Sequence, residues 1–213
     1  MSPLSRHAVQ HDEALARLRA GNDRFRQDVP RVEPVASQQR RDALVSGQAP
    51  FAIVLSCSDS RAPAELLFDC GLGDLFVVRV AGNVVAPSIV GSIEFAASTY
   101  GTELVVVMGH TRCGAIAATI DALAGGTHDH SENVLDIVDR IAPSIAELVC
   151  DVVPDEAIAR KAMRANVRAS TSHLRHASRT IESRIAEGRL MVVGAEYALE
   201  TGTVDFFDMP RTP

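Results

Sequence analysis

The sequence predicts an α/β fold in which helices flank a mostly parallel central β-sheet. The first observation is a set of short apolar runs rich in Val, Ile and Leu, which are continuous rather than alternating, as in strands buried on both faces. They span residues 51–56, 75–80 and 103–108. The second observation is that helical segments separate these runs. Alternation of strands and helices is typical of parallel sheets covered on both faces.

The other elements follow from apolar periodicity and from the positions of Pro and Gly. Helices are predicted at residues 11–27, 37–45, 63–68, 88–100 and 112–123, and over most of 134–188 with interruptions at Pro143 and Pro154. Two further strands are predicted at residues 190–194 and 203–207. The 213 residues are expected to form a single domain. Within it, residues 1–50 form a helical N-terminal arm and residues 51–208 the α/β core.

Composition and charge exclude several classes of function. Lys and Arg number 21 against 27 Asp and Glu, for a net charge of −6. An acidic chain without a basic block is a poor candidate for nucleic-acid binding. Trp is absent, and two Tyr are too few for a base-stacking platform. No apolar run has the length of a signal peptide or a membrane helix, so a cytoplasmic protein with no membrane partner is expected.

The four cysteines divide into two pairs by their surroundings. They are too sparse for a disulfide-stapled domain, so reduced thiols are expected. Cys57 and Cys113 each lie in a polar cluster that directly follows a predicted buried strand, at residues 56–61 and 109–114. Cys70 and Cys150 have no such neighbours and are expected to be buried packing residues.

The two polar clusters together supply a set of metal ligands. Ligands bind beyond the carboxyl ends of parallel strands, where both clusters are expected. Two thiolates, one imidazole and one carboxylate complete a four-coordinate zinc shell and disfavour Mg²⁺ and Ca²⁺. The candidate ligands are Cys57, Asp59, His110 and Cys113.

A shell of four protein ligands is usually structural, so a non-catalytic zinc protein is one hypothesis. Arg61 offers another, because an arginine can form a bidentate pair with a carboxylate and so draw Asp59 away from the metal. A coordination position would then open for water. The strand-end placement favours the catalytic hypothesis. A redox dithiol lacks a Cys-x-x-Cys motif, and a serine hydrolase lacks a G-x-S-x-G motif.

The motifs CSDSR at residues 57–61 and GHTRCG at 109–114 resemble those of the β-class carbonic anhydrases. Further similar segments, in the family's order, are LRAGNDRF at 18–25, GQ at 47–48, FVVRVAGN at 76–83 and GSIEF at 91–95. The resemblance runs from about residue 12 to residue 207. It implies a β-carbonic anhydrase-like fold, in agreement with the α/β prediction above.

The resemblance implies zinc-dependent reversible hydration of CO2 to bicarbonate and a proton through zinc-bound hydroxide. One Zn²⁺ per chain is expected on Cys57, His110 and Cys113, with Asp59 in an exchangeable fourth position. Asp59 and Arg61 match the family's catalytic dyad, which gates the metal and orients water. The gate predicts that activity rises with pH. Hydrolysis of carbonyl sulfide or carbon disulfide on the same scaffold is the alternative reaction.

The resemblance also implies two pockets. Gln48, Phe76, Phe95 and Gly114 match the substrate pocket, part of which comes from a neighbouring subunit in the family. A homodimer or tetramer is therefore expected. Some bacterial members have a non-catalytic bicarbonate pocket built from Trp, Arg and Tyr. Arg79 and Tyr197 match the last two, but Val54 stands at the Trp position.

Overall fold

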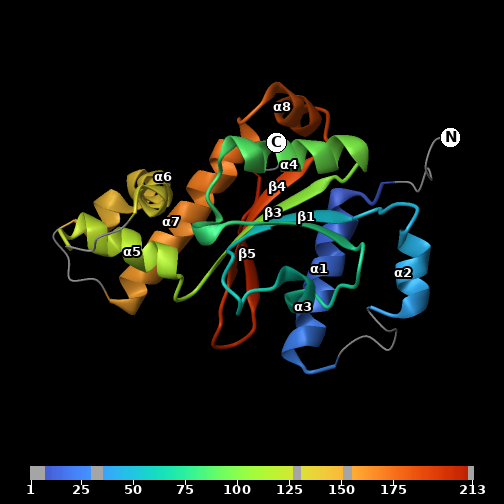
Figure 1. Cartoon of the computed structure of the whole chain (residues 1–213), viewed down its shortest axis with the longest axis horizontal. Coiled ribbons are helices and arrows are strands. Elements are labelled where there is room, and N and C mark those ends of the chain that lie inside the picture. Colours follow the sequence, from blue (N-terminus) through green and yellow to red (C-terminus); the bar gives the residue numbers. More distant parts are fainter. Residues whose placement is uncertain (1–7, 30–35, 127–130, 151–154, 211–213) are drawn as a thin grey trace.

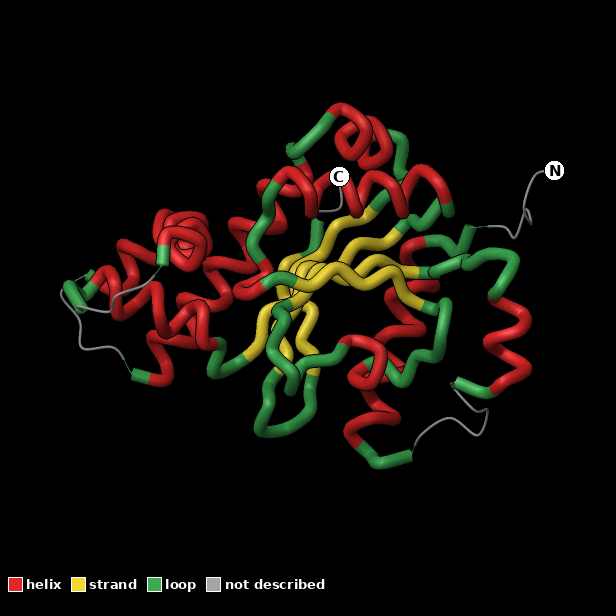
Figure 2. The backbone as a smooth tube through the Cα atoms, in the orientation of Figure 1, coloured by secondary structure: helices red, strands yellow, loops and turns green. Residues whose placement is uncertain are grey.

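A five-stranded sheet lies at the centre of the computed structural model, which describes residues 8–29, 36–126, 131–150 and 155–210 (Figures 1 and 2). The strand order is β2-β1-β3-β4-β5. The first four strands are parallel and β5 is antiparallel to β4. This confirms the predicted fold class. The strands are β1 (Ala52–Ser56), β2 (Leu75–Arg79), β3 (Leu104–His110), β4 (Met191–Tyr197) and β5 (Val204–Asp208).

Helices cover both faces of the sheet, so β1, β3 and β4 are buried along their whole length. On one face, α1 and α3 bury apolar residues such as Leu18 and Leu67 against the sheet side that carries Val54 and Val106. Helices α4 to α8 pack on the other face. The helices are α1 (His11–Arg26), α2 (Gln38–Leu44), α3 (Ala64–Leu67), η1 (Ala81–Asn83), α4 (Pro87–Thr99), α5 (Gly114–Leu123), α6 (Glu132–Val149), α7 (Glu156–Arg175) and α8 (Arg179–Ala186).

Two strands continue beyond their predicted ends. β3 runs through His110 and β4 through Tyr197, and these two residues pair with each other. His110 is therefore the last residue of a strand rather than part of the loop after it. The predictions ended each strand where its apolar run ends. The strands continue further because backbone pairing does not require apolar side chains.

The predicted interruption at Pro143 is wrong, because α6 continues through that residue. A proline inside a helix removes one hydrogen bond, but packing of an amphipathic face supplies most helical stability. Ile141 and Ile145 on either side of Pro143 are fully buried, so that face is anchored in the core. The predicted interruption at Pro154 lies outside the described residues.

The cysteines follow the expected pattern with one exception. Cys57, Cys70 and Cys113 are buried. The prediction that Cys150 is buried is wrong, because this residue follows α6 at its exposed end.

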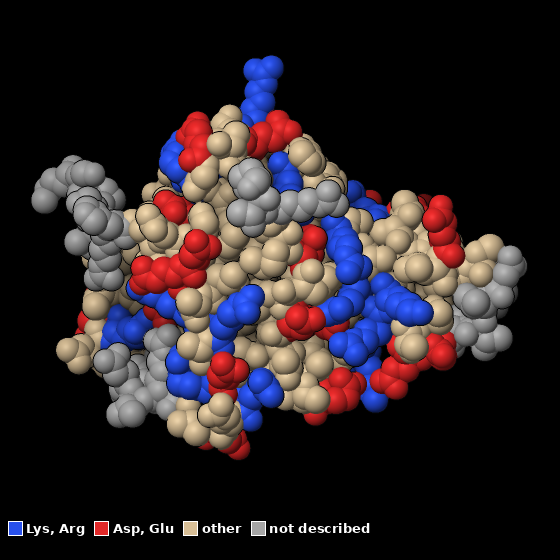
Figure 3. Space-filling model, turned by 180° about the vertical axis from the view of Figure 1, so that it is seen from behind, with Lys and Arg blue, Asp and Glu red and all other residues tan. Residues whose placement is uncertain are grey.

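Charges of both signs are interspersed over the face shown in Figure 3. Within the described ranges, no helix combines the length and apolar character needed to cross a membrane.

Candidate metal centre

The ends of two neighbouring strands bring the candidate ligands together. β1 and β3 pair in parallel, with Ser56 opposite Met108, so the residues that follow lie at the same edge of the sheet. Cys57 comes directly after β1 and His110 ends β3. Cys113 is the N-cap residue of α5.

Cys57, His110 and Cys113 form a buried group whose ligand atoms all lie within 4.8 Å of one another. The two Sγ atoms are 4.0 Å apart. His110 is 1% exposed, and its Nδ1 donates to the carbonyl of Thr111 at 2.8 Å, so Nε2 is the unprotonated nitrogen of the neutral ring. Nε2 is buried and has no hydrogen-bond partner among the described residues. Buried polar atoms are nearly always paired, so this nitrogen and the two thiols fit a zinc ion.

The thiols also influence each other's protonation. The hydrogen bond with Cys113 lowers the pKa of Cys57 and outweighs the opposing effect of burial; His110 and the Gly82 N–H contribute in the same direction. The same contact, together with burial, raises the pKa of Cys113. The Gly82 N–H, 3.4 Å from Cys57 Sγ, favours negative charge on that sulfur.

Gly82 is a supporting residue that the sequence analysis did not single out. Its φ is 67°, in the left-handed region that favours glycine. A Cβ there would lie 2.7 Å from Ile141 Cδ1 and 3.1 Å from Ala115 Cβ. Its carbonyl accepts a hydrogen bond from Asn166 Nδ2 at 2.8 Å. Its position, a glycine shortly after the strand predicted at residues 75–80, was the sequence feature that could have indicated this role.

Asp59 lies beside the metal-ligand group and is paired with Arg61. Arg61 Nε and Nη2 donate to the two carboxylate oxygens at 2.9 and 2.7 Å, and its backbone N–H donates to Oδ1 at 2.9 Å. Asp59 Oδ2 is 3.8 Å from His110 Nε2. Hydrogen bonds from the Arg61 side chain hold the pKa of Asp59 well below its usual range.

Arg79 supports the backbone of the same loop. Its Nε and Nη2 donate to the carbonyls of Cys57 and Asp59, at 3.0 and 2.6 Å. Tyr197 is buried at the end of β4, which β1 and β3 separate from the strand of Arg79. Val54 is fully buried in the core on the sheet face that α1 and α3 cover.

Three of the four candidate substrate-pocket residues lie elsewhere. The rings of Phe76 and Phe95 are 6.4 Å apart, and Gln48 Nε2 donates to the hydroxyl of Tyr100 at 3.0 Å. The Tyr100 ring contacts both phenylalanines, at 6.2 and 5.8 Å. We call Gln48, Phe76, Phe95 and Tyr100 the aromatic cluster; Tyr100 was not predicted.

The aromatic cluster and the metal-ligand group lie toward opposite ends of β1. Phe76 pairs with Ile53, four residues before Cys57, and four residues of a strand span about 13 Å. Phe95 is 53% exposed, so the cluster is open at the surface. Gly114, the fourth candidate, begins α5 directly after Cys113 and so lies beside the metal-ligand group.

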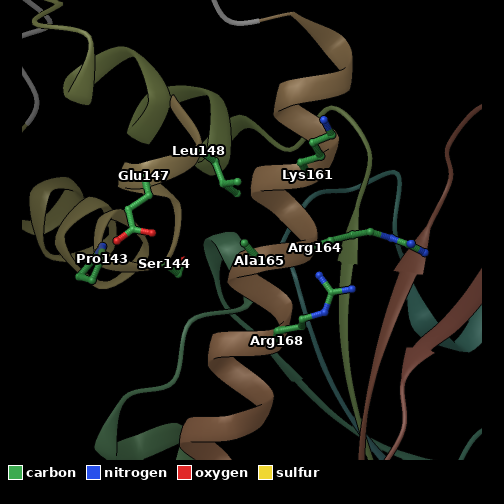
Figure 4. A pocket seen from close by; sticks show the side chains of 8 residues that line it. All are labelled: Pro143, Ser144, Glu147, Leu148, Lys161, Arg164, Ala165 and Arg168. Atoms are coloured by element: carbon green, nitrogen blue, oxygen red, sulfur yellow. The ribbon is translucent and has the colours of Figure 1, made fainter. Parts of the chain in front are cut away.

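A groove of about 590 Å³ between α6 and α7 is a separate feature (Figure 4). Lys161, Arg164 and Arg168 line it on α7. Arg164 extends away from α6 and pairs with Glu196 and Asp205. Its charge is therefore already compensated outside the groove.

Comparison with known proteins places the chain in a family. The carbonic anhydrase family model matches residues 52–204, so the chain belongs to the carbonic anhydrases, and its solved structural relatives place it in the β class. It is 40% identical over 187 residues to carbonic anhydrase 2 of Mycobacterium tuberculosis, covering 87% of each chain. It is 39% identical over 196 residues to the carbonic anhydrase of Mycolicibacterium smegmatis, covering 88% of this chain and 89% of the relative. The solved β-carbonic anhydrase CcaA matches with a TM-score of 0.67 and 26% identity, over 93% and 92% of the two chains.

Proposed function

We propose that this protein catalyses the zinc-dependent reversible hydration of CO2 to bicarbonate and a proton. The observation that carries the proposal is the convergence of Cys57, His110 and Cys113 beside the Asp59–Arg61 pair. Membership of the carbonic anhydrase family supports the same reaction.

Cys57, His110 and Cys113 would hold one zinc ion. When bound, zinc supplies Lewis acidity that makes water a nucleophile near neutral pH. Two thiolates and a neutral imidazole suit this ion. Because Nδ1 of His110 donates to a backbone carbonyl, its Nε2 is available as a ligand.

Asp59 and Arg61 would form the catalytic dyad. With both carboxylate oxygens held by Arg61, Asp59 is directed away from the ligand role. Its Oδ2 still faces the site and can accept a hydrogen bond from the reacting water, orienting that water toward CO2. We propose that release of Asp59 from Arg61 closes the site by bringing the carboxylate to the metal.

A second copy of the chain would complete the substrate pocket. Gly114 lies in the same chain beside Cys113, whereas the exposed aromatic cluster lies about 13 Å along the strand from its own metal-ligand group. The cluster would therefore serve a neighbouring copy's site, with the phenylalanines as an apolar wall for CO2 and Gln48 as a donor to bound oxygen. This arrangement requires a homodimer or a tetramer. We assign no bicarbonate pocket to Arg79 and Tyr197, since Arg79 is engaged by the metal loop.

We further propose that the chain is one domain, in which the N-terminal arm covers the core, and that it works in the cytoplasm. The burial of Leu18 of α1 in the same cluster as Val106 of β3 supports the first proposal. Thiol ligands that must stay reduced support the second.

The test is CO2 hydration by stopped flow on metal-quantified protein across pH, with carbonyl sulfide assayed in parallel. About one zinc per chain and an activity that rises with pH are expected. Cys113→Ser should lose both zinc and activity, whereas Cys150→Ser, at an exposed cysteine outside the group, should keep both. Zinc without hydration would indicate a structural metal. Turnover of carbonyl sulfide alone would indicate the hydrolase.

A further inference from the structure

Glu200 lies in the turn between β4 and β5. Its carboxylate holds the loop between His110 and Cys113 at two points. The hydroxyl of Thr111 donates to Glu200 Oε2 at 3.0 Å. Arg112 Nε donates to Oε1 of the same carboxylate at 2.8 Å. One side chain therefore fixes two consecutive residues of the loop between His110 and Cys113.

The two residues held by Glu200 present their carbonyls to the two halves of the site. The carbonyl of Thr111 accepts the Nδ1–H of His110 at 2.8 Å. The carbonyl of Arg112 accepts a hydrogen bond from Arg61 Nη2 at 3.3 Å. Glu200 is thereby linked through one dipeptide both to a metal-binding imidazole and to the arginine that holds Asp59.

The backbone of this dipeptide requires outside support. Arg112 has a φ of 56°, in the left-handed region that a non-glycine residue adopts at a cost in energy. Such conformations persist where neighbouring contacts determine them. Thr111 N–H donates to the Tyr197 carbonyl and Thr111 Oγ1 accepts from Leu199 N–H, both at 3.0 Å. The contacts of Glu200 and a 3.1 Å ion pair of Arg112 with Glu156 complete the support.

We propose that Glu200 is a positioning residue for the metal site. Acting through Thr111 and Arg112, it holds the His110 ring in the orientation and tautomer that leave Nε2 for the metal, and it steadies Arg61. The inference rests on the zinc site of the proposed function. Outer contacts of metal-binding histidines typically change metal affinity 10–100-fold when they are removed.

The experiment compares Glu200→Ala and Thr111→Val with the wild type by two measurements. Zinc affinity is measured by chelator competition, and both variants should bind zinc about tenfold more weakly or worse. Both changes remove the Thr111–Glu200 hydrogen bond, and each also removes one contact of its own, Arg112 to Glu200 or Leu199 N–H to Thr111. The double variant should therefore lose less affinity than the product of the two single losses. Nitrogen-15 NMR of metal-free protein with a neutral His110 ring should show a single Nδ1–H tautomer in the wild type and a mixture in both variants.

Two controls separate positioning from general disturbance of the turn. Thr111→Ser keeps the hydroxyl and should keep wild-type affinity. Thr201→Val removes a comparable hydrogen bond of the same turn, from Thr201 to Thr203 Oγ1 at 3.0 Å, and should also bind zinc normally.

Zinc affinity within twofold of the wild type in Glu200→Ala and Thr111→Val, or an equal loss in Thr201→Val, would overturn the inference. A single His110 tautomer in both variants would do the same. If Glu200→Ala does not fold, the difference between Thr111→Ser and Thr111→Val decides. A wild type that binds no zinc would refute the proposed function instead, and the tautomer measurement on metal-free protein would still decide the role of Glu200.

Discussion

Replacement of Gly82 by Ala tests how the backbone that contacts Cys57 is held in place. The residue combines a positive φ with close neighbours and donates its N–H to Cys57 Sγ. Alanine at a left-handed φ costs about 1–2 kcal/mol. Its Cβ would meet Ile141 Cδ1 at 2.7 Å, and overpacking a core typically costs about 1–3 kcal/mol. Because Cδ1 is the end of a side chain that can shift, the lower part of that range applies.

The free energy of unfolding of Gly82→Ala should therefore fall by about 2–4 kcal/mol. For a chain of this size the melting temperature should fall by roughly 5–15 °C. The assay is urea denaturation of metal-free protein. Alanine keeps the backbone N–H that contacts Cys57 Sγ, so the expected effect is on stability rather than on loss of this donor.

Gly91→Ala is the matched control. Gly91 lies within α4, and a Cβ there would meet no described atom within 4 Å. Alanine is a better helix former by about 1 kcal/mol, so this variant should be as stable as the wild type or more stable. Surface substitutions usually change the free energy of unfolding by less than about 0.5 kcal/mol. If Gly82→Ala differs from the wild type by no more than this, the reasoning from φ and contact distance is wrong.

Three further predictions concern charge and assembly. Glu196, which is 1% exposed, pairs with Arg160 and Arg164, so Glu196→Gln should lower the free energy of unfolding by about 2 kcal/mol; unchanged urea denaturation would contradict this. Arg140 holds the pKa of Asp136 below its ordinary 3.8, so their pairing stabilises the fold above pH 3.8 and is lost as the pH falls through the lower folded value. Carbon-13 NMR should find an Asp136 midpoint below 3.8 that returns to the ordinary range in Arg140→Ala; identical midpoints would refute the pairing. Phe95→Asp should weaken self-association about tenfold or more, because burial of a Phe contributes about 1.5–3 kcal/mol, and should reduce CO2 hydration. Light scattering measures the self-association. Leu123→Asp, at a 41% exposed residue of α5, is the control that should assemble normally. Equal assembly of both variants would count against a substrate pocket completed by a second copy of the chain.

The strands and the metal motifs were predictable from local sequence. Residues that a parallel sheet buries on both faces must be apolar without alternation, which marks β1 and β3 directly. Polar residues at the ends of such strands are exceptions to that rule, so Cys57 and His110 were conspicuous. Their closeness followed from the meeting of parallel strand ends at one edge of the sheet.

The sequence by itself determined the fold class and singled out the three side chains that converge as a candidate metal-ligand group. The pairing of Asp59 with Arg61, two residues apart, was also predicted from the sequence. The tertiary structure alone decided that Glu200 holds the loop beside His110 and that Phe76 packs with Phe95 away from the metal-ligand group. It also decided that α6 passes through Pro143. The physical reason is distance along the chain: periodicity and spacing describe neighbours in sequence, whereas these contacts join residues brought together when the sheet and its helices pack.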